Sequence, residues 1–147
     1  MAPGTKFQPI LDDPSIVDKS AVHRVVFCAG KLYYDLVKER AARGDSVSGR
    51  VAFVRIEELS PFPFAEVQNV LEGYGSAKEL LWVQEEPRNQ GAYAHVAPRF
   101  GSVLQRMGRG GQLVYRGRRE DAVPAPGISK LYAAQQKAVL ASAFEGL

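Results

Sequence analysis

The sequence of 147 residues predicts an α/β domain in three layers, a mainly parallel sheet with helices on both faces. Short apolar runs rich in β-branched residues alternate with segments of helical periodicity, in the order β-α-β-α-β-α-β-α. Strands that are joined through helices run parallel and are buried on both faces, so they appear as continuous apolar runs. Hydrophobic residues make up 46% of the chain and charged residues 24%, which is typical of a globular domain.

The first part of the chain predicts a linker, a strand and a helix. Residues 1–21 are dotted with proline and aspartate and are expected to be a linker or the end of a preceding domain, so the domain itself would cover residues 22–147. Val22–Cys28 is an apolar run with several β-branched residues and predicts a buried strand. Lys31–Arg43 has apolar residues at helical spacing and predicts a helix that ends before a glycine.

The middle of the chain repeats this pattern. Arg50–Ile56 is a second apolar run and predicts a second strand. Two prolines follow it, and because proline favours the first turn of a helix, they predict a helix over Phe64–Glu72. Glu79–Gln84 is again apolar and predicts a third strand, which ends in a cluster of polar residues.

The last part predicts a long helix, a strand and a closing helix. The long helix is expected over Gln90–Met107, with Asn89 as its N-cap residue. A kink or break is expected near Ala97, because Pro98 lies inside this segment and lacks a backbone N–H. The remaining strand, irregular loop and helix are predicted at Gln112–Arg116, Gly117–Gly127 and Ile128–Phe144.

Positive charge is concentrated in one stretch, although the net charge is only +3. Six arginines and no acidic residue lie between Arg99 and Arg119, whereas the rest of the chain sums to −3. Two interpretations stay open: the stretch binds an anionic ligand or an acidic partner, or it is a solvated face. The candidate anion-binding residues are Arg116, Arg118 and Arg119 after the fourth strand, because guanidinium groups bind phosphate and carboxylate through paired hydrogen bonds.

Two acidic pairs follow predicted strands, Glu57-Glu58 and Glu85-Glu86. Adjacent strand residues point to opposite faces, so neither pair is an acid–base dyad by itself. If the two strands are neighbours, one glutamate of each pair would converge at the carboxyl edge of the sheet, with Arg88 placed to neutralise them. One interpretation is a charged network, including Asn89, that frames an active site or an interface; the other is acids favoured by a helix dipole.

Several functional classes are not expected. Nucleic-acid binding is not expected, because the arginines are not interleaved with stacking aromatic residues, and no apolar run is long enough to span a membrane. One cysteine and two histidines provide neither a disulfide framework nor a metal-binding cluster. No phosphate-binding glycine loop or nucleophile elbow occurs. Cys28, His95 and Trp82 are interpreted as packing residues, with a functional thiolate at Cys28 and a catalytic His95 as the alternatives.

Four ordered motifs resemble those of a known family. They are FCAGKLYYDL (Phe27–Leu36), RIEELSPFP (Arg55–Pro63), WVQEEPRNQG (Trp82–Gly91), and YRGR with PAPG (Tyr115–Arg118 and Pro124–Gly127). Together they resemble the C-terminal domain of the thiamine-dependent decarboxylase component of 2-oxoglutarate dehydrogenase. The related 2-oxoadipate dehydrogenase shares these motifs, so both substrates stay open. Full chains of the family are roughly six times longer, far above the size of one domain.

The resemblance implies a three-layer fold like the C-terminal domain of transketolase. It implies that the domain helps to build a homodimer and frames the active sites, with no catalytic residue of its own. Thiamine diphosphate and magnesium would be held by an earlier domain, so this chain alone is expected to bind no cofactor. The whole enzyme would decarboxylate 2-oxoglutarate and pass the succinyl group to a lipoyl-bearing succinyltransferase.

The resemblance also implies a location and an effector. The enzyme would work in the mitochondrial matrix of eukaryotes or in the bacterial cytoplasm. In some members of the family this domain forms part of an acyl-CoA or nucleotide regulatory site, and such an effector is expected here without assigned contacts. The alternative from another class is a stand-alone module that binds an acyl-CoA or a nucleotide through the arginine-rich stretch.

Overall fold

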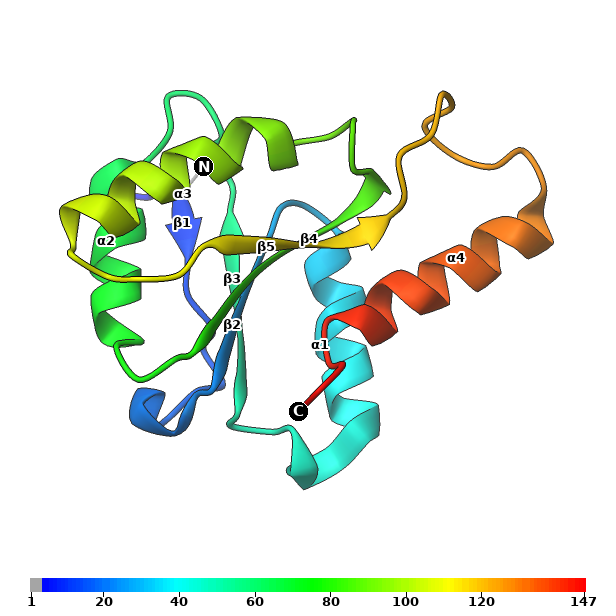
Figure 1. Ribbon diagram of the computed structural model, residues 1–147. Helices are drawn as coiled ribbons and strands as arrows, with labels where there is room; N and C mark the ends of the chain where they lie inside the picture. The colour runs from blue at the N-terminus through cyan, green and yellow to red at the C-terminus, as the bar shows by residue number, and fades with distance from the viewer. Residues whose placement is uncertain (1–3) are drawn as a thin grey trace.

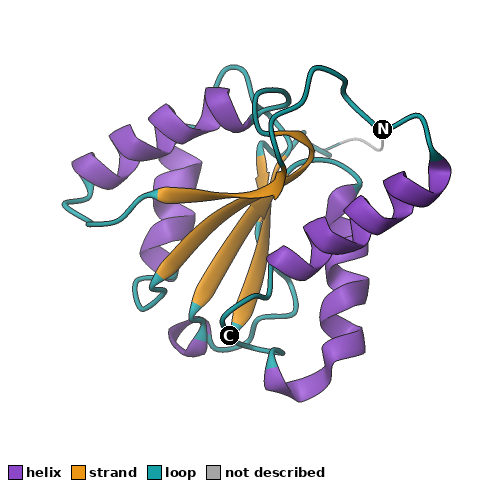
Figure 2. Cartoon of the chain, turned by 45° about the vertical axis from the view of Figure 1, so that its right-hand side comes forward, coloured by secondary structure: helices purple, strands orange, loops and turns teal. Residues whose placement is uncertain are grey.

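A five-stranded sheet with helices on both faces forms the centre of the structure (Figures 1 and 2). The computed structural model describes residues 4–147, so residues 1–3 of the predicted linker lie outside the described residues. The predicted α/β fold class is confirmed. The elements are β1 (Ile10–Leu11), η1 (Lys19–Ala21), β2 (Arg24–Cys28), α1 (Leu32–Arg43), η2 (Gly44–Ser46), β3 (Val51–Ile56), α2 (Phe64–Gly73), β4 (Glu79–Pro87), α3 (Tyr93–Arg106), β5 (Leu113–Arg118) and α4 (Ser129–Ser142).

The strands lie in the order β1-β3-β2-β4-β5, with β1 antiparallel to β3 and the other pairs parallel. Helices α1 and α4 cover one face of the sheet, and α2 and α3 cover the other (Figure 2). The chain passes from β2 to β3 on one side and returns past β2 to form β4 and β5 on the other. The direction of winding therefore changes between β2 and β4.

The central strand β2 is apolar throughout its middle because both of its faces are covered. Val25 and Phe27 face α2 and α3, and the ring of Phe27 meets Phe100 of α3 edge-on with centroids 4.7 Å apart. Val26 and Cys28 face α1 and α4. A strand buried on both faces cannot alternate between apolar and polar residues, which is why the sequence contains a continuous apolar run here.

The long helix α3 differs from its prediction at two points. It begins at Tyr93 rather than Gln90, and the residue before it is Ala92, so Asn89 is not its N-cap. It continues through Pro98 to Arg106, so a break near Ala97 is wrong, while the alternative of a kink there stays a prediction. Its apolar residues on both sides of the proline are buried against the sheet and α2, and this packing outweighs the loss of one backbone hydrogen bond; they are Val96, Phe100, Val103 and Leu104.

The segment predicted as a linker contributes to the sheet. Ile10 and Leu11 form β1, which pairs with Ile56 and Arg55 of β3. A two-residue strand is too short to show any periodicity in the sequence, so the prolines around it suggested an irregular segment. This part of the chain is anchored by contacts that are distant in sequence.

A buried ion pair fixes the N-terminal segment against α1 and β3. The guanidinium of Arg40 donates to the Asp13 carboxylate over 2.6 Å, to the carbonyl of Val51 over 2.8 Å and to the hydroxyl of Ser15 over 2.6 Å. The Asp13 carboxylate also accepts the Phe53 backbone N–H at 2.8 Å. Both charged side chains are almost completely buried, and each has hydrogen-bonding partners in addition to the other.

The substitution Asp13→Asn is expected to destabilise the chain by about 3–5 kcal/mol, because it leaves the buried Arg40 charge uncompensated. Urea unfolding followed by circular dichroism measures the change. The exposed Glu66 in the first turn of α2 is the matched control, and Glu66→Ala should cost about 1 kcal/mol or less. Equal costs for the two variants would contradict the role of the ion pair.

This contribution depends on pH. Burial alone would raise the pKa of the Asp13 carboxyl, but hydrogen bonds from Arg40, Ser15 and the Phe53 amide together lower the pKa below its usual 3.8. A lowered pKa in the folded state contributes stability that is fully present above the unfolded-state value and is lost as the pH falls through the folded-state value. The stability difference between wild type and Asp13→Asn should therefore shrink only below pH 3.8. A difference that disappears at higher pH would contradict this assignment.

Candidate functional site

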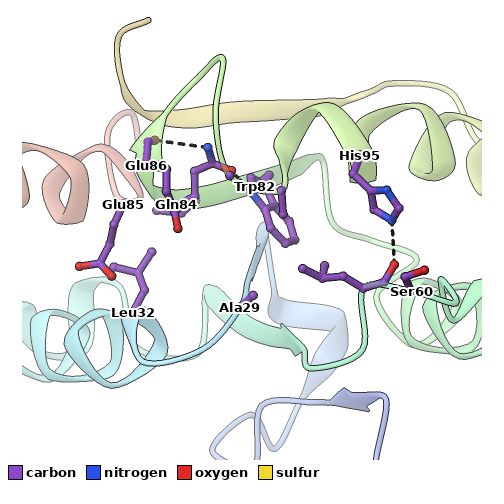
Figure 3. A pocket seen from close by; sticks show the side chains of 12 residues that line it. Ala29, Leu32, Ser60, Trp82, Gln84, Glu85, Glu86 and His95 are labelled. Carbon is purple, nitrogen blue, oxygen red and sulfur yellow. Dashed lines mark hydrogen bonds between the residues drawn. The ribbon is translucent and has the colours of Figure 1, made fainter. Parts of the chain in front are cut away.

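A cavity of about 460 Å³ opens at the carboxyl ends of β2 and β4, where the winding of the sheet changes direction. Open α/β sheets commonly bind ligands or partners at such a switch point. The walls come from the turn after β2, the segment after β3 and the loop between β4 and α3 (Figure 3). Ala29, Leu32, Leu59 and Trp82 provide apolar surface, and Ser60, Gln84, Glu85, Glu86 and His95 provide polar groups.

The side-chain amide of Gln84 organises the loop beside this cavity. Its oxygen accepts hydrogen bonds from the Trp82 indole N–H at 2.8 Å and from the Tyr93 backbone N–H at 2.9 Å. Its nitrogen lies 2.7, 3.0 and 3.3 Å from the carbonyl oxygens of Gln90, Pro87 and Glu86. Gln84 is buried, so these bonds satisfy the polar atoms of its own side chain. One side chain therefore joins the end of β4 to the start of α3.

Two glycines let the chain approach Gln84 closely, Gly91 at its side-chain amide and Gly117 at its backbone carbonyl. Gly91 has a φ of 65°, and a Cβ atom there would lie 2.8 Å from Nε2 of Gln84. A Cβ atom at Gly117 in β5 would lie 2.9 Å from the carbonyl oxygen of Gln84 and would overlap the ring of Tyr115. Both positions lie in the motifs WVQEEPRNQG and YRGR, so each motif contains a glycine that its contacts with Gln84 require.

The two acidic pairs do not converge. Strand β2 lies between β3 and β4, so the condition that their strands are neighbours is not met. Glu57 has Arg55 as its ion-pair partner at 3.7 Å, with Glu58 beside it in the chain. Glu85 instead contacts Lys31 at 3.3 Å and accepts a hydrogen bond of 2.7 Å from Gln136 of α4. Glu85 and Glu86 both line the cavity at the switch point.

Arg88 and Asn89 connect two loops that are distant in sequence. The guanidinium of Arg88 lies 5.8 and 5.9 Å from the ring centroids of Tyr93 and Tyr115, and its backbone N–H donates to the Arg118 carbonyl. It does not neutralise a converging acidic cluster, as the sequence suggested, because no such cluster forms. The side chain of Asn89 donates to the Asp121 carbonyl at 3.0 Å and accepts the Asp121 backbone N–H at 3.1 Å. The loops after β4 and β5 thus form one polar platform.

The arginines of the arginine-rich stretch do not share one role. Arg99 donates to the His95 carbonyl at 2.6 Å within its own helix. Arg109 donates to the carbonyls of Leu71, Tyr74 and Ala77, which closes the end of α2. The stretch is therefore not one continuous anion-binding surface. Of the three candidate residues, Arg118 and Arg119 line one cavity at the end of β5, whereas Arg116 does not line it and has a long bond of 3.4 Å to the Tyr115 carbonyl.

Cys28 and Trp82 are in the core, and His95 lies at the wall of the cavity. Burial raises the pKa of the Cys28 thiol to about 12, which favours the packing interpretation over a reactive thiolate. His95 Nε2 lies 2.7 Å from the Leu59 carbonyl; because that oxygen only accepts, Nε2 carries the proton (Figure 3). Sequence reasoning missed the role of Gln84 and the placement of His95. Their hydrogen-bond partners include residues that no local sequence pattern identifies.

Metal-binding and membrane-spanning features are not found among residues 4–147. No group of three or more histidine, cysteine, aspartate or glutamate side chains there has a geometry that could hold a metal ion. No helix in the same range has both the length and the apolar composition to cross a bilayer.

The sequence matches one protein family along nearly its whole length. Residues 1–144 match the family described as 2-oxoglutarate dehydrogenase C-terminal. The chain belongs to this family. The segments that surround Gln84 and the polar platform lie within the matched residues.

Similar proteins agree with this membership. The chain is 44% identical to the 2-oxoadipate dehydrogenase complex component E1 of Danio rerio over 146 residues, which are 98% of this chain and 15% of that protein. It is 40% identical to a probable 2-oxoadipate dehydrogenase complex component E1 homolog of Dictyostelium discoideum, and covers 15% of it. It is also 40% identical to a mitochondrial 2-oxoglutarate dehydrogenase-like protein of Rattus norvegicus, of which it covers 14%. The chain spans about a seventh of these relatives.

A solved structure supports the predicted fold. A solved structure described as a split-gene transketolase, an inactive tetramer, superposes on this chain with a TM-score of 0.63 at 14% identity. The match covers all of this chain and 44% of that chain. The predicted transketolase-like fold is confirmed for this member of the 2-oxoglutarate dehydrogenase C-terminal family.

The substitution Gly91→Ala is expected to loosen the Gln84 contacts. The left-handed backbone costs a non-glycine residue about 1–2 kcal/mol, and the added methyl group would also displace the Gln84 amide. The chain has one tryptophan, Trp82, which is buried at the wall of the cavity, so its fluorescence emission should shift to longer wavelength as the loosened loop admits water to the indole.

The matched control is Gly101→Ala on the exposed side of α3, where an added Cβ meets nothing within 4 Å. This change should stabilise the protein by about 0.5–1 kcal/mol, because alanine is the better helix former. Denaturant unfolding and emission spectra of both variants measure the two effects. A silent Gly91→Ala would mean that the close approach is not required.

Proposed function

We propose that this chain acts as the assembly and regulatory domain of the decarboxylase component of a 2-oxo acid dehydrogenase complex. The observation that carries the proposal is the family match over residues 1–144 together with relatives of about 40% identity. The proposed substrate is 2-oxoglutarate or 2-oxoadipate, because relatives of similar identity carry both names. The proposed location is the mitochondrial matrix in a eukaryote, in line with the mitochondrial relative, or the cytoplasm in a bacterium.

The chemistry proposed for the whole enzyme lies outside this domain. Thiamine diphosphate and magnesium would be held by an earlier domain, and the acyl group formed by decarboxylation would pass to a lipoyl-bearing succinyltransferase. No metal-binding cluster is found among the described residues, and the Cys28 thiol is deeply buried. Both observations support a role in which this domain provides no reacting group. This domain would frame the active sites of a homodimer through the polar platform of Glu85, Glu86, Arg88 and Asn89, and Glu57 with Glu58 at the neighbouring edge.

The rigidity of the platform supports this framing role. Its backbone is fixed by the hydrogen bonds of the Gln84 side chain and by the two hydrogen bonds between Asn89 and Asp121. Its outer groups, which include Glu86 and Asn89, remain exposed. A polar surface that is already ordered loses little conformational entropy when it binds a second subunit.

The chain alone is expected to show no decarboxylase activity. With 2-oxoglutarate, thiamine diphosphate and magnesium, the purified protein should not reduce ferricyanide, because the described residues provide neither a metal cluster nor an activated nucleophile. The same assay is run with 2-oxoadipate, for which the full-length Danio rerio relative is the positive control. Saturable ferricyanide reduction by the chain would overturn the proposal.

The platform is expected to act at an interface in the assembled enzyme. In a chimera that carries this chain in place of the matching segment of the Danio rerio relative, Glu85→Ala with Arg88→Ala should weaken dimerisation or turnover while the domain stays folded. Sedimentation, turnover and circular dichroism measure these effects. Glu66→Ala is the control on α2. Unchanged sedimentation and turnover would favour a purely local role for these side chains.

A further inference from the structure

Arg118 is a buried cation without an anionic partner. Arg24, Arg40 and Arg118 are the arginines buried in the described part of the chain. Arg24 contacts the Glu79 carboxylate and two carbonyls near the end of α4, and Arg40 contacts Asp13. Arg118, which is only 9% exposed, forms no ion pair with a carboxylate in residues 4–147. A buried charge normally has such a partner, because its desolvation is costly.

The contacts of Arg118 leave hydrogen-bonding capacity unused. Its guanidinium lies 4.9 Å from the ring centroid of Tyr132 in α4. One terminal nitrogen has a long bond of 3.4 Å to Gln136, and the Nε atom has no hydrogen-bond partner. Gln136 in turn donates to Glu85, so the side chain of Arg118 is connected to the Glu85 carboxylate only through the Gln136 amide. The planar fork of arginine suits a phosphate or carboxylate group that binds through two oxygens.

A cavity of about 350 Å³ adjoins Arg118 between α4 and the loop after β5. This size falls within the range of about 300–1,000 Å³ that is typical of small-molecule sites. Arg119 lies at the same cavity and is exposed. Glu120 and Asp121 also line it, but neither forms an ion pair with Arg118 or Arg119 among the described residues. The remaining walls include apolar side chains, namely Val123, Pro124, Ala138 and Val139.

We propose that this cavity binds a small ligand with a phosphate or carboxylate head, held by Arg118 and Arg119, and an apolar body that packs against the proline-rich loop and α4. The loop is already positioned for this role, since Asn89 and Gln90 both donate to the Asp121 carbonyl over 3.0 Å. The proposal is independent of the role of the whole enzyme, because it concerns binding by this chain alone.

The experiment uses the 147-residue chain with phenyl phosphate and benzoate as probes, and inorganic phosphate as the head group alone. Thermal unfolding is followed at constant ionic strength, and affinities are measured by titration calorimetry. At least one of the two aromatic probes should raise Tm with increasing concentration. The probe that binds more tightly identifies phosphate or carboxylate as the head group.

Three variants test the assignment. Arg118→Met should weaken binding at least tenfold and keep or raise stability, because it replaces an unpaired buried charge with an apolar side chain. Arg119→Ala should also weaken binding, and it tests the site separately if Arg118→Met does not fold. Arg106→Ala removes an exposed arginine of the same stretch that does not line the cavity, so it should bind as the wild type does. A Tm indifferent to all three probes, or an affinity equal to that of the wild type in both the Arg118 and the Arg119 variant, would overturn the proposal.

Discussion

The carboxyl edge of this domain depends on one buried amide, that of Gln84. A side-chain amide both accepts and donates hydrogen bonds, so Gln84 pairs with two N–H groups and three carbonyls from the end of β4 to the start of α3. A carboxylate at this position would repel the carbonyls, and an apolar residue would leave all five groups without this partner. The loop after β4 and the start of α3 therefore take their positions from this residue. The polar groups around the switch-point cavity follow from that arrangement.

The buried arginines of this fold differ in whether a carboxylate compensates their charge. Arg24 and Arg40 tie distant ends of the chain to the sheet, and each is matched by a carboxylate. Their energy is mostly the avoided cost of an uncompensated charge, so they specify one arrangement more than they add net stability. Arg118 has an aromatic ring and one amide instead. This difference between otherwise similar residues marks the end of β5 as a place where the domain by itself is electrostatically incomplete.

The two loops that carry the family motifs work as one unit. Asn89 and Gln90 from the loop after β4 bind the backbone at Asp121 from the loop after β5, and Tyr115 of β5 donates to the Glu86 carbonyl of β4 at 3.1 Å. The platform faces outward beside the switch-point cavity, and the candidate anion site lies beyond β5. A change in either loop would be transmitted to the other through these bonds.

The sequence by itself determined the α/β class, the succession of the main strands and helices along the chain, and the family. Apolar runs, helical periodicity and the four motifs are local patterns, so they can be read without the tertiary structure. It also placed Glu85, Arg88 and Arg118 near strand ends. It did not show β1, the continuity of α3 through Pro98, or the separation of Glu57 from Glu85 by β2. The tertiary structure decided these features and the contacts of Gln84 and Arg118, since strand order and the partner of a buried polar group depend on residues far apart in the chain.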